Sequence, residues 1–206
     1  MDASALFQFD ETVRRDYPVI AGLDEAGRGP LAGPVVAGAV ILPAGCIIEG
    51  LKDSKLTTLN ERLRLFNDIT ANAIAIGIGI VSSDAIDRIN ILQSTYLAMK
   101  SAVRHLKQNP GILLIDAVRL PDIEIPQKSI IKGESVSASI AAASIIAKVV
   151  RDNLMEKYHE IYPLYNFSKH KGYGTKEHIS LIRAHGPCPI HRKTFRKVKD
   201  VELPLA

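Results

Sequence analysis

Three carboxylates follow short apolar runs of the chain, and they are the residues whose placement first suggests chemistry. Asp24 and Glu25 come directly after Pro18–Leu23, and Asp116 comes directly after Ile112–Ile115. Open α/β sheets bind ligands in the crevice beyond the ends of their strands. Three carboxylates meeting there repel one another unless a cation lies between them, and oxygen ligands favour Mg²⁺ or Mn²⁺ over zinc. The sequence therefore predicts a divalent-metal site, with solvated turn residues as the alternative.

A fourth oxygen ligand is available from either of two acidic residues. Glu134 follows the short predicted strand Ser129–Ile131 and opens a long helix, whereas Asp152 lies 18 residues further along. That separation is roughly 27 Å along one helix axis, so a continuous helix cannot bring both to one site. Lys148 stands four residues before Asp152, a spacing typical of an intrahelical ion pair. Glu134 is therefore the predicted ligand, and Asp152 is the second choice.

The glycines after the first acidic pair bear on how both acids reach one site. Neighbouring strand residues point to opposite faces, so the two acids share a site only if the chain bends, and Gly27 and Gly29 supply a bend. Gly27–Ala32 also fits a dinucleotide-binding pattern, but Val35–Leu42 after it is predicted to be a strand rather than a helix. We expect the turn to approach a sugar-phosphate chain, with Arg28 adding positive charge.

Positive charge is concentrated near the end of the chain. The formal net charge is +4, yet the segment Asn166–Lys199 holds nine Lys or Arg and one acid, Glu177, with histidines and aromatic residues between them. This composition favours a polyanionic partner, and a solvated tail is the alternative. Lys55, which precedes another predicted helix, could hold a phosphate if it lies near the acids.

The composition indicates one globular domain in a reducing compartment. The chain has 206 residues, 47% of them hydrophobic and 23% charged. Cys46 and Cys188 show neither a disulfide framework nor zinc-ligand spacing. Because no signal peptide or membrane-spanning run is visible, we expect a cytoplasmic protein with no membrane association.

Apolar patterns predict the elements that must position these residues. Isoleucines alternate with small residues over 74–80, which predicts a strand with one buried and one nearly bare face. The small-residue run Ser137–Ala147 predicts a helix that packs tightly against the bare side of the sheet. The order of elements indicates a mixed α/β sheet with helices against it. The predicted strands are 18–23, 35–42, 74–80, 112–115 and 129–131, and the predicted helices are 56–72, 91–106, 137–159 and 176–184.

Together these segments resemble ribonuclease HII, the bacterial type 2 ribonuclease H, in the order expected and from about Val19 to Lys199. The resemblance implies a ribonuclease H-like α/β fold, with a mixed five-stranded sheet flanked by helices. It implies a catalytic domain over 18–165 and a small basic, helical substrate-binding extension over 166–206. The segments that carry it are LDEAGRGPLAGPVVAGAVIL (23–42), DSK (53–55), LLID (113–116), the stretch 132–152 and HKGYGTKEH (170–178).

The resemblance also implies an activity. The chain would be an endonuclease that hydrolyses RNA in RNA–DNA hybrids and incises 5′ of ribonucleotides embedded in duplex DNA. Two Mg²⁺ or Mn²⁺ ions would serve catalysis, and the products would carry 3′-hydroxyl and 5′-phosphate ends. The expected substrate is an RNA–DNA hybrid or a ribonucleotide-containing duplex, and the expected state is a monomer. A binder without catalysis and a dinucleotide-dependent oxidoreductase are the alternatives; the intact carboxylates and the strand after the glycines argue against them.

Roles for single residues follow from the same resemblance. Asp24, Glu25, Asp116 and Glu134 would be metal ligands and catalytic residues, although the family usually carries Asp in the position of Glu134. Residues expected to contact the substrate comprise the turn that would recognise the ribose 2′-hydroxyl, a tyrosine that would stack on the sugar after the junction, and three basic residues. They are Gly27, Arg28 and Gly29, then Tyr173, and then Lys55, His191 and Arg192.

Overall fold

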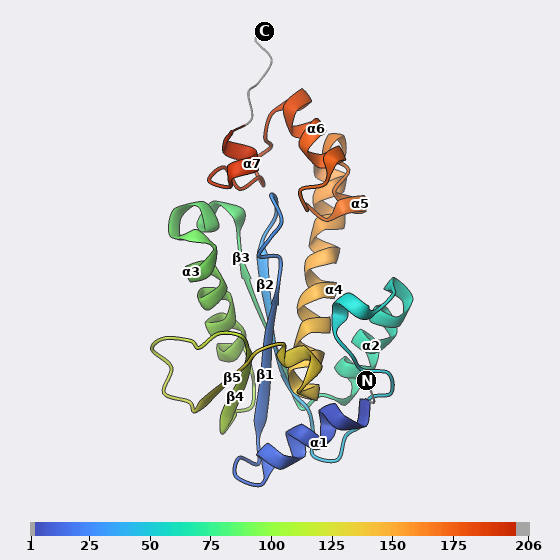
Figure 1. Ribbon diagram of the computed structural model, residues 1–206, viewed down its shortest axis with the longest axis vertical. Coiled ribbons are helices and arrows are strands. Elements are labelled where there is room, and N and C mark those ends of the chain that lie inside the picture. Colours follow the sequence, from blue (N-terminus) through green and yellow to red (C-terminus); the bar gives the residue numbers. More distant parts are fainter. Residues whose placement is uncertain (1–2, 201–206) are drawn as a thin grey trace.

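Five strands form one mixed sheet in the order β3-β2-β1-β4-β5. The computed structural model describes residues 3–200 (Figure 1). The central strand β1 pairs antiparallel with β2 and parallel with β4. The outer pairs are β2 with β3, antiparallel, and β4 with β5, parallel. The strands are β1 (Ile20–Ala26), β2 (Val35–Ile41), β3 (Ala75–Val81), β4 (Ile112–Asp116) and β5 (Gln127–Ile130). The predicted mixed five-stranded sheet is confirmed.

Helices cover both faces of this sheet (Figure 1). One face packs against α3, and the other packs against α4 with α1 and α2 outside it. The helices are α1 (Ala3–Arg14), α2 (Leu59–Asn72), α3 (Ser83–Arg104), α4 (Ala138–Ile161), α5 (Phe167–His170), α6 (Lys176–His185) and α7 (Arg196–Lys199). Short 3-10 turns lie at Ser54–Leu56, Gly133–Ser135 and Pro163–Tyr165. No helix in residues 3–200 is long and apolar enough to cross a membrane.

The small-residue helix does pack tightly, but on the centre of the sheet. A Cβ atom on Gly22 of β1 would lie 2.0 Å from the backbone of Ser139, so α4 can approach only because that side chain is absent. The bare face of β3 is covered by α3 instead, since a Cβ on Gly79 would meet the Ala98 carbonyl at 1.9 Å. The glycine face of β3 is therefore the buried one, whereas Ile80 on the opposite face is exposed.

The N-terminal helix α1 was not predicted, yet it is tied into the core. Asp10 is buried and accepts hydrogen bonds from the hydroxyl groups of Ser137 and Ser139 at 2.6 Å, and from the Ser139 amide at 2.8 Å. It thereby satisfies donors at the first turn of α4. Leu6 and Phe7 pack against the same helix. Helix α4 is therefore held at its first turn by a residue far away in the sequence.

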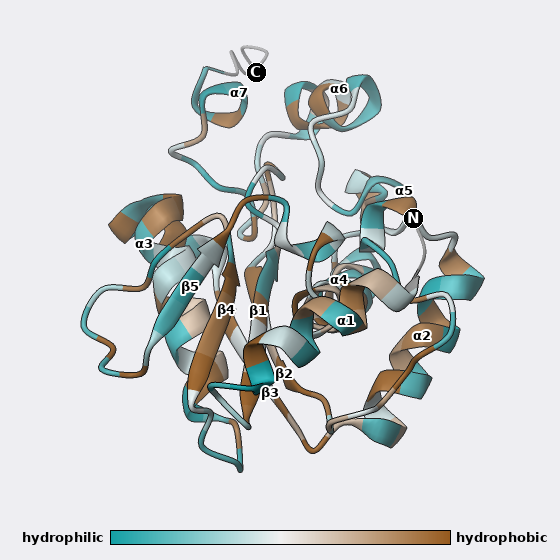
Figure 2. Cartoon of the chain, turned by 60° about the horizontal axis from the view of Figure 1, so that its bottom comes forward, coloured by the Kyte–Doolittle hydropathy of each residue, from teal (hydrophilic) through white to brown (hydrophobic). Residues whose placement is uncertain are grey.

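The basic C-terminal segment is joined to the loop between β1 and β2 by backbone hydrogen bonds. Leu31 donates from its amide to the Gly172 carbonyl, and Gly33 donates to the Ile190 carbonyl, at 2.8 and 2.9 Å. Ala32 also forms an isolated bridge with His191. In Figure 2 the helices α6 and α7 stand above the sheet, whose strand β4 is almost uniformly hydrophobic. The division into a catalytic domain and a C-terminal extension at residue 165/166 stays a prediction. The last six residues of that extension, 201–206, lie outside the described part of the chain.

Candidate active site

Parallel strand ends bring three acidic positions to one edge of the sheet. Leu23 pairs with Ile115, so Asp24 and Asp116 are the next residues on neighbouring strands. Asp116 in turn pairs with Ile130, four residues before Glu134. The Gly133 amide donates to Asp116 Oδ1 at 2.7 Å, which fixes the turn that carries Glu134 against β4.

Asp24 and Glu25 share a pocket although β1 does not break between them. The ladder with β2 continues through both and through Ala26, and the chain turns only afterwards, at Gly27 with φ +100°. Both side chains line a pocket of about 230 Å³, together with Lys55. The other residues of its lining are Ala26, Gly27, Arg28, Gly29, Ser54, Ser144, Lys148 and Tyr173.

The acids of this edge are electrostatically unfavourable without a counter-charge. Burial raises the pKa of Asp24 well above its usual range, and the neighbouring carboxylates of Glu25 and Asp116 raise it further. Burial also raises the pKa of Glu25, against the effect of Arg28, whose Nη1 lies 3.2 Å from Glu25 Oε1. Lys55 Nζ lies 3.5 Å from Glu134 Oε1. We call Asp24, Glu25, Asp116 and Glu134 the carboxylate edge.

Two buried oxygens test whether a cation fits this edge. Glu25 Oε2 and Glu134 Oε2 are buried and accept no hydrogen bond within the described residues. A buried carboxylate oxygen without a partner is costly, and a divalent cation would satisfy it. In residues 3–200 no three Asp, Glu, His or Cys side chains are grouped closely enough to enclose one ion. Mg²⁺ is commonly held by one or two carboxylates with water and substrate phosphates completing its shell, so the oxygen donors present fit it.

Asp152, the second-choice ligand, is engaged elsewhere. Lys148 Nζ lies 2.8 Å from Asp152 Oδ1, and Arg62 Nη1 lies 3.5 Å from Oδ2. The predicted intrahelical pair is therefore confirmed. Glu134 does not open α4 itself, because it sits in a separate 3-10 turn that ends before the helix begins at Ala138.

His191 and Arg192, which were expected to contact the substrate, are buried. Their exposed fractions are 1% and 0%. Arg192 instead binds backbone carbonyls of the loop that follows β1. In this arrangement neither side chain reaches a ligand in the pocket, whereas Tyr173 is 44% exposed and lines it.

His191 belongs to a histidine cluster, which we define as His170, His178 and His191. His178 Nδ1 lies 2.9 Å from the Tyr173 carbonyl, which can only accept, so Nδ1 carries the proton. His178 Nε2 then accepts from His191 Nε2 at 3.0 Å. His191 Nδ1 is left to accept from the Cys188 amide at 2.9 Å. One neutral tautomer of each ring thus satisfies the chain from Cys188 to Tyr173.

This arrangement opposes protonation of the rings. Burial lowers the pKa of His178 to about 4, and His170 lowers it further. Burial likewise lowers the pKa of His191 to about 4, with a further contribution from His178. His170 and His178 stack at a ring-centroid distance of 4.3 Å. The cluster fixes the backbone that carries Tyr173 and does not offer a free ligand.

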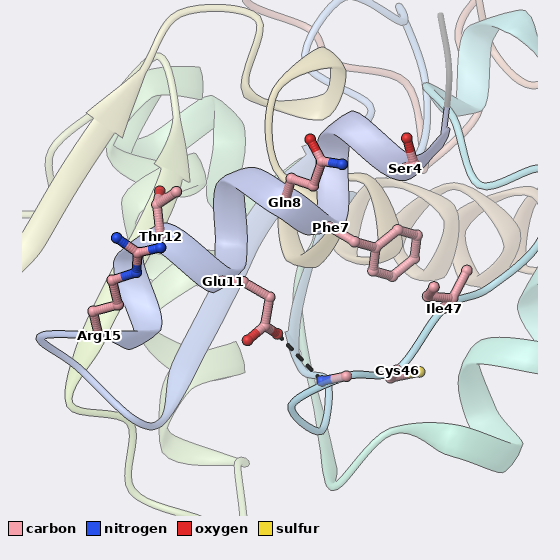
Figure 3. Close-up of a pocket in the computed structure, with 9 residues that line it drawn as sticks. Ser4, Phe7, Gln8, Glu11, Thr12, Arg15, Cys46 and Ile47 are labelled. Atoms are coloured by element: carbon pink, nitrogen blue, oxygen red, sulfur yellow. Dashed lines mark hydrogen bonds between the residues drawn. The ribbon is translucent and has the colours of Figure 1, made fainter.

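A larger pocket, of about 590 Å³, lies away from this chemistry. It is formed by α1 and the loop after β2, with Phe7 and Ile47 beside Glu11 and Arg15 (Figure 3). Glu11 accepts a hydrogen bond from the Gly45 amide across it. In Figure 1 α1 lies at the foot of β1, at the opposite end of that strand from the acids. None of the predicted site residues lines this pocket.

Three residues of the site were missed by sequence reasoning. The Ser144 hydroxyl hydrogen-bonds the Asp24 carboxylate and lies 2.9 Å from the Ser54 hydroxyl. Arg151 is wholly buried beneath the pocket. A signal existed only for Arg151, as a long charged residue in an apolar stretch of α4, whereas the serines look like ordinary packing residues.

Comparison with known proteins settles the family. The family model described as Ribonuclease HII matches residues 21–198. The chain belongs to the ribonuclease HII family. The ribonuclease HII of Acetivibrio thermocellus is 58% identical over 187 residues, which cover 91% of this chain and 73% of that protein. The present chain is therefore an endonuclease of the ribonuclease H type. As a member of this family it acts on RNA–DNA hybrids and depends on divalent metal.

Solved structures share the fold. The ribonuclease H2 of Pyrococcus horikoshii OT3 superposes with a TM-score of 0.73 at 25% identity, covering 89% of this chain and 96% of that one. Bst-RNase HIII, solved in complex with Mn²⁺, gives a TM-score of 0.69 at 22% identity, covering 88% and 68%. The predicted ribonuclease H-like architecture is confirmed by these likenesses.

Proposed function

We propose that the carboxylate edge is the catalytic centre, and that it cleaves RNA in hybrids and incises 5′ of single ribonucleotides in duplex DNA. The observation that carries the proposal is the meeting of three parallel strand ends, where Glu25 and Glu134 each leave one buried oxygen without a hydrogen-bond partner in the described part of the chain. Asp24, Glu25, Asp116 and Glu134 would hold two Mg²⁺ or Mn²⁺ ions. When bound, such ions activate water for in-line attack and stabilise the departing 3′-oxygen. The products would carry 3′-hydroxyl and 5′-phosphate ends.

The chain's own residues would orient the substrate around these acids. Lys55 is exposed at its tip and lies beside Glu134, where it can pair with a phosphate. Tyr173 lines the same pocket and can stack on a sugar. Arg28, which pairs with Glu25 here, can exchange that partner for a phosphate.

The turn formed by Gly27, Arg28 and Gly29, which we call the glycine turn, would distinguish ribose from deoxyribose through backbone contact with the 2′-hydroxyl. Gly29 supports this role because, within residues 3–200 and apart from its two chain neighbours, nothing lies within 4 Å of where its Cβ would be, and its φ is not in the left-handed region. The chain itself therefore gives no reason for glycine there. Close approach of a substrate backbone does give one.

The direct test is cleavage of a duplex that contains one ribonucleotide, with and without chelator, followed by mapping of the product ends. We expect a single cut on the 5′ side that requires Mg²⁺ or Mn²⁺. Cleavage that persists in chelator, or cuts on the 3′ side only, contradicts the proposal.

A second test uses paired alanine substitutions. Gly29→Ala should lower incision at a single ribonucleotide about tenfold or more, as expected when polar contacts worth over 1.4 kcal/mol are displaced. Gly111→Ala is the control, since its Cβ would make only ordinary contacts, the nearest at 3.6 Å from the Val19 carbonyl. Equal incision by the two variants would remove the turn from substrate recognition.

A further inference from the structure

Two fully buried guanidinium groups lie behind the glycine turn. Arg151 comes from α4 and Arg192 from the segment before α7, and each is 0% exposed. Within residues 3–200 neither one makes an ion pair with a carboxylate, and their donors are directed at backbone carbonyls. Buried arginines are normally matched by carboxylates, so this pair requires an explanation.

Arg192 binds the loop between β1 and β2 at both of its ends, at the glycine turn and at Gly33. It donates to the carbonyls of Gly27 at 2.5 Å and of Arg28 at 2.9 Å, and its Nε and Nη2 both reach the Gly33 carbonyl, at 3.1 and 2.9 Å. One planar fork thus connects two points of the loop that are six residues apart. Lysine, with a single ammonium group, cannot reproduce that geometry.

Arg151 holds the rest of the loop and ties it to the C-terminal segment. It donates to the carbonyls of Pro34 at 3.0 Å and Ala32 at 3.1 Å, and to the Lys171 carbonyl at 3.0 Å. Its guanidinium carbon also lies 5.8 Å from the centre of the Tyr173 ring. The two sides of the substrate pocket, the turn and the tyrosine, therefore share this one support.

The carbonyl groups of Gly27 and Arg28 accept hydrogen bonds from Arg192, whereas the amides of the turn point elsewhere. The amides of Gly27, Arg28 and Gly29 donate no hydrogen bond within the part of the chain that the structure describes. All three residues line the pocket beside the carboxylate edge. Donors left free at a pocket wall, over carbonyls fixed from behind, form a site prepared for an oxygen acceptor.

The charges of the two arginines add to this preparation. Burial lowers the pKa of Arg192 to about 9, and the positive charge of Arg151 lowers it further. Both groups are still charged at neutral pH. Asp152 acts electrostatically on Arg151 and Asp87 on Arg192, but within residues 3–200 neither forms an ion pair with its arginine. The two guanidinium groups therefore add positive potential under the turn, which attracts a phosphodiester.

We propose that Arg151 and Arg192 are positioning residues that fix the glycine turn for substrate and supply positive charge beneath it. The inference rests on the proposed role of the turn in recognising ribose. It separates two effects: the fork geometry sets the discrimination between ribose and deoxyribose, and the charge sets the attraction of phosphate.

Substitutions of Arg192 can separate these effects. In chelator, which prevents cleavage, we would measure the Kd of an RNA–DNA hybrid and of the matching DNA duplex over a range of salt concentrations. Arg192→Lys keeps the charge, so the salt slope should stay near the wild-type value while the preference for hybrid falls about tenfold, as for lost hydrogen bonds to a charged group. Arg192→Gln should lose the preference and also flatten the slope. Arg151→Lys and Arg151→Gln should behave in the same way.

The control is a mostly buried arginine away from the site, Arg14, whose charge is matched by Glu11 with Nε 3.1 Å from Oε1. Arg14 has an 8% exposed side chain and donates to the carbonyls of Leu42 and Pro18, at 2.8 and 3.2 Å. Arg14→Lys and Arg14→Gln should affect thermal melting but neither Kd nor the salt slope. If the Arg192 and Arg151 variants fold and bind as the Arg14 variants do, the proposal is wrong.

A measurement on the wild-type protein covers variants that do not fold. The Nε–H NMR signals of Arg151 and Arg192 should shift when uncleaved hybrid is added in chelator, while that of Arg14 should not. Unchanged Arg151 and Arg192 signals in a protein that binds hybrid overturn the inference. If the wild type shows no preference for hybrid and no 5′ incision, the proposed function fails instead.

Discussion

The carboxylate edge and the histidine cluster are both groups of buried titratable side chains, but they differ in how many of their polar atoms have hydrogen-bond partners. At the carboxylate edge, Glu25 and Glu134 each leave one buried oxygen without a hydrogen-bond partner among residues 3–200, and burial together with like charges raises the pKa of Asp24. In the histidine cluster, the chain of hydrogen bonds from Cys188 to Tyr173 leaves no ring nitrogen of His178 or His191 free. Buried polar atoms that lack hydrogen-bond partners indicate a binding site, whereas buried polar atoms that all have partners indicate a structural role.

The largest effect should come from the carboxylate edge. Asp24→Asn and Asp116→Asn each remove a proposed metal ligand, so cleavage should fall about a thousandfold or more, equivalent to roughly 4 kcal/mol in the barrier. Hybrid binding should survive, because loss of a negative charge also relieves repulsion of phosphate. Turnover is measured on a single-ribonucleotide duplex.

Asp10→Asn is the matched control for these variants. Asp10 is also a buried acid whose pKa is raised by burial, but its oxygens accept from Ser137 and Ser139. This variant should lower thermal stability and leave turnover per folded molecule unchanged. Loss of turnover in Asp10→Asn, or wild-type turnover in Asp24→Asn, would erase the distinction.

Glu134 tests the fourth position of the edge. Glu134→Ala should lower the rate strongly and raise the metal concentration needed, whereas Glu134→Asp should keep much of the activity. Asp152→Asn should cost about 1 kcal/mol of stability through its contacts with Lys148 and Arg62, with little change in turnover. Titration of turnover against metal for the three variants decides the assignment. An inactive, folded Asp152→Asn beside an active Glu134→Ala would reverse it.

Acid should weaken the histidine cluster. The pKa of His178 is about 4 in the folded protein and 6.5 ordinarily, so the unfolded chain takes up a proton first as pH falls. The stabilisation is complete above about 6.5 and is lost as pH falls from there towards about 4. His178→Asn removes this titration and should flatten the dependence of unfolding free energy on pH over that window. An identical pH dependence in the variant and the wild type would contradict the assigned tautomers.

The smallest effects should come from exposed cations outside both groups. Arg183 and Lys197 line a groove between α6 and α7 and are exposed. Changing either to Gln should weaken hybrid binding a few-fold and flatten the slope of log K against log salt by roughly 0.7–0.9 per lost phosphate contact. Lys107→Gln, exposed just beyond α3, is the control. Unchanged slopes would make the basic segment a solvated surface.

Much of the fold was predictable because strand and helix periodicity is local. The five strands and the helices corresponding to α2, α4 and α6 follow from apolar spacing. Helix α1 was not predicted, because its charged residues hide a short apolar face whose partner, α4, lies more than a hundred residues away. The start of α3 was missed since Asn90, with φ +65°, interrupts the helical pattern.

The sequence by itself determined the carboxylate edge, because acids at strand ends and a basic segment are properties of local order and composition. Which charged residues face the pocket emerges only from the tertiary structure. His191 and Arg192 stand in a basic stretch with nothing to distinguish them, yet folding buries both and turns Arg192 towards the carbonyls of a loop some 160 positions earlier. Burial and partner geometry depend on contacts distant in sequence, and these contacts leave one cation exposed at the pocket while another supports the backbone.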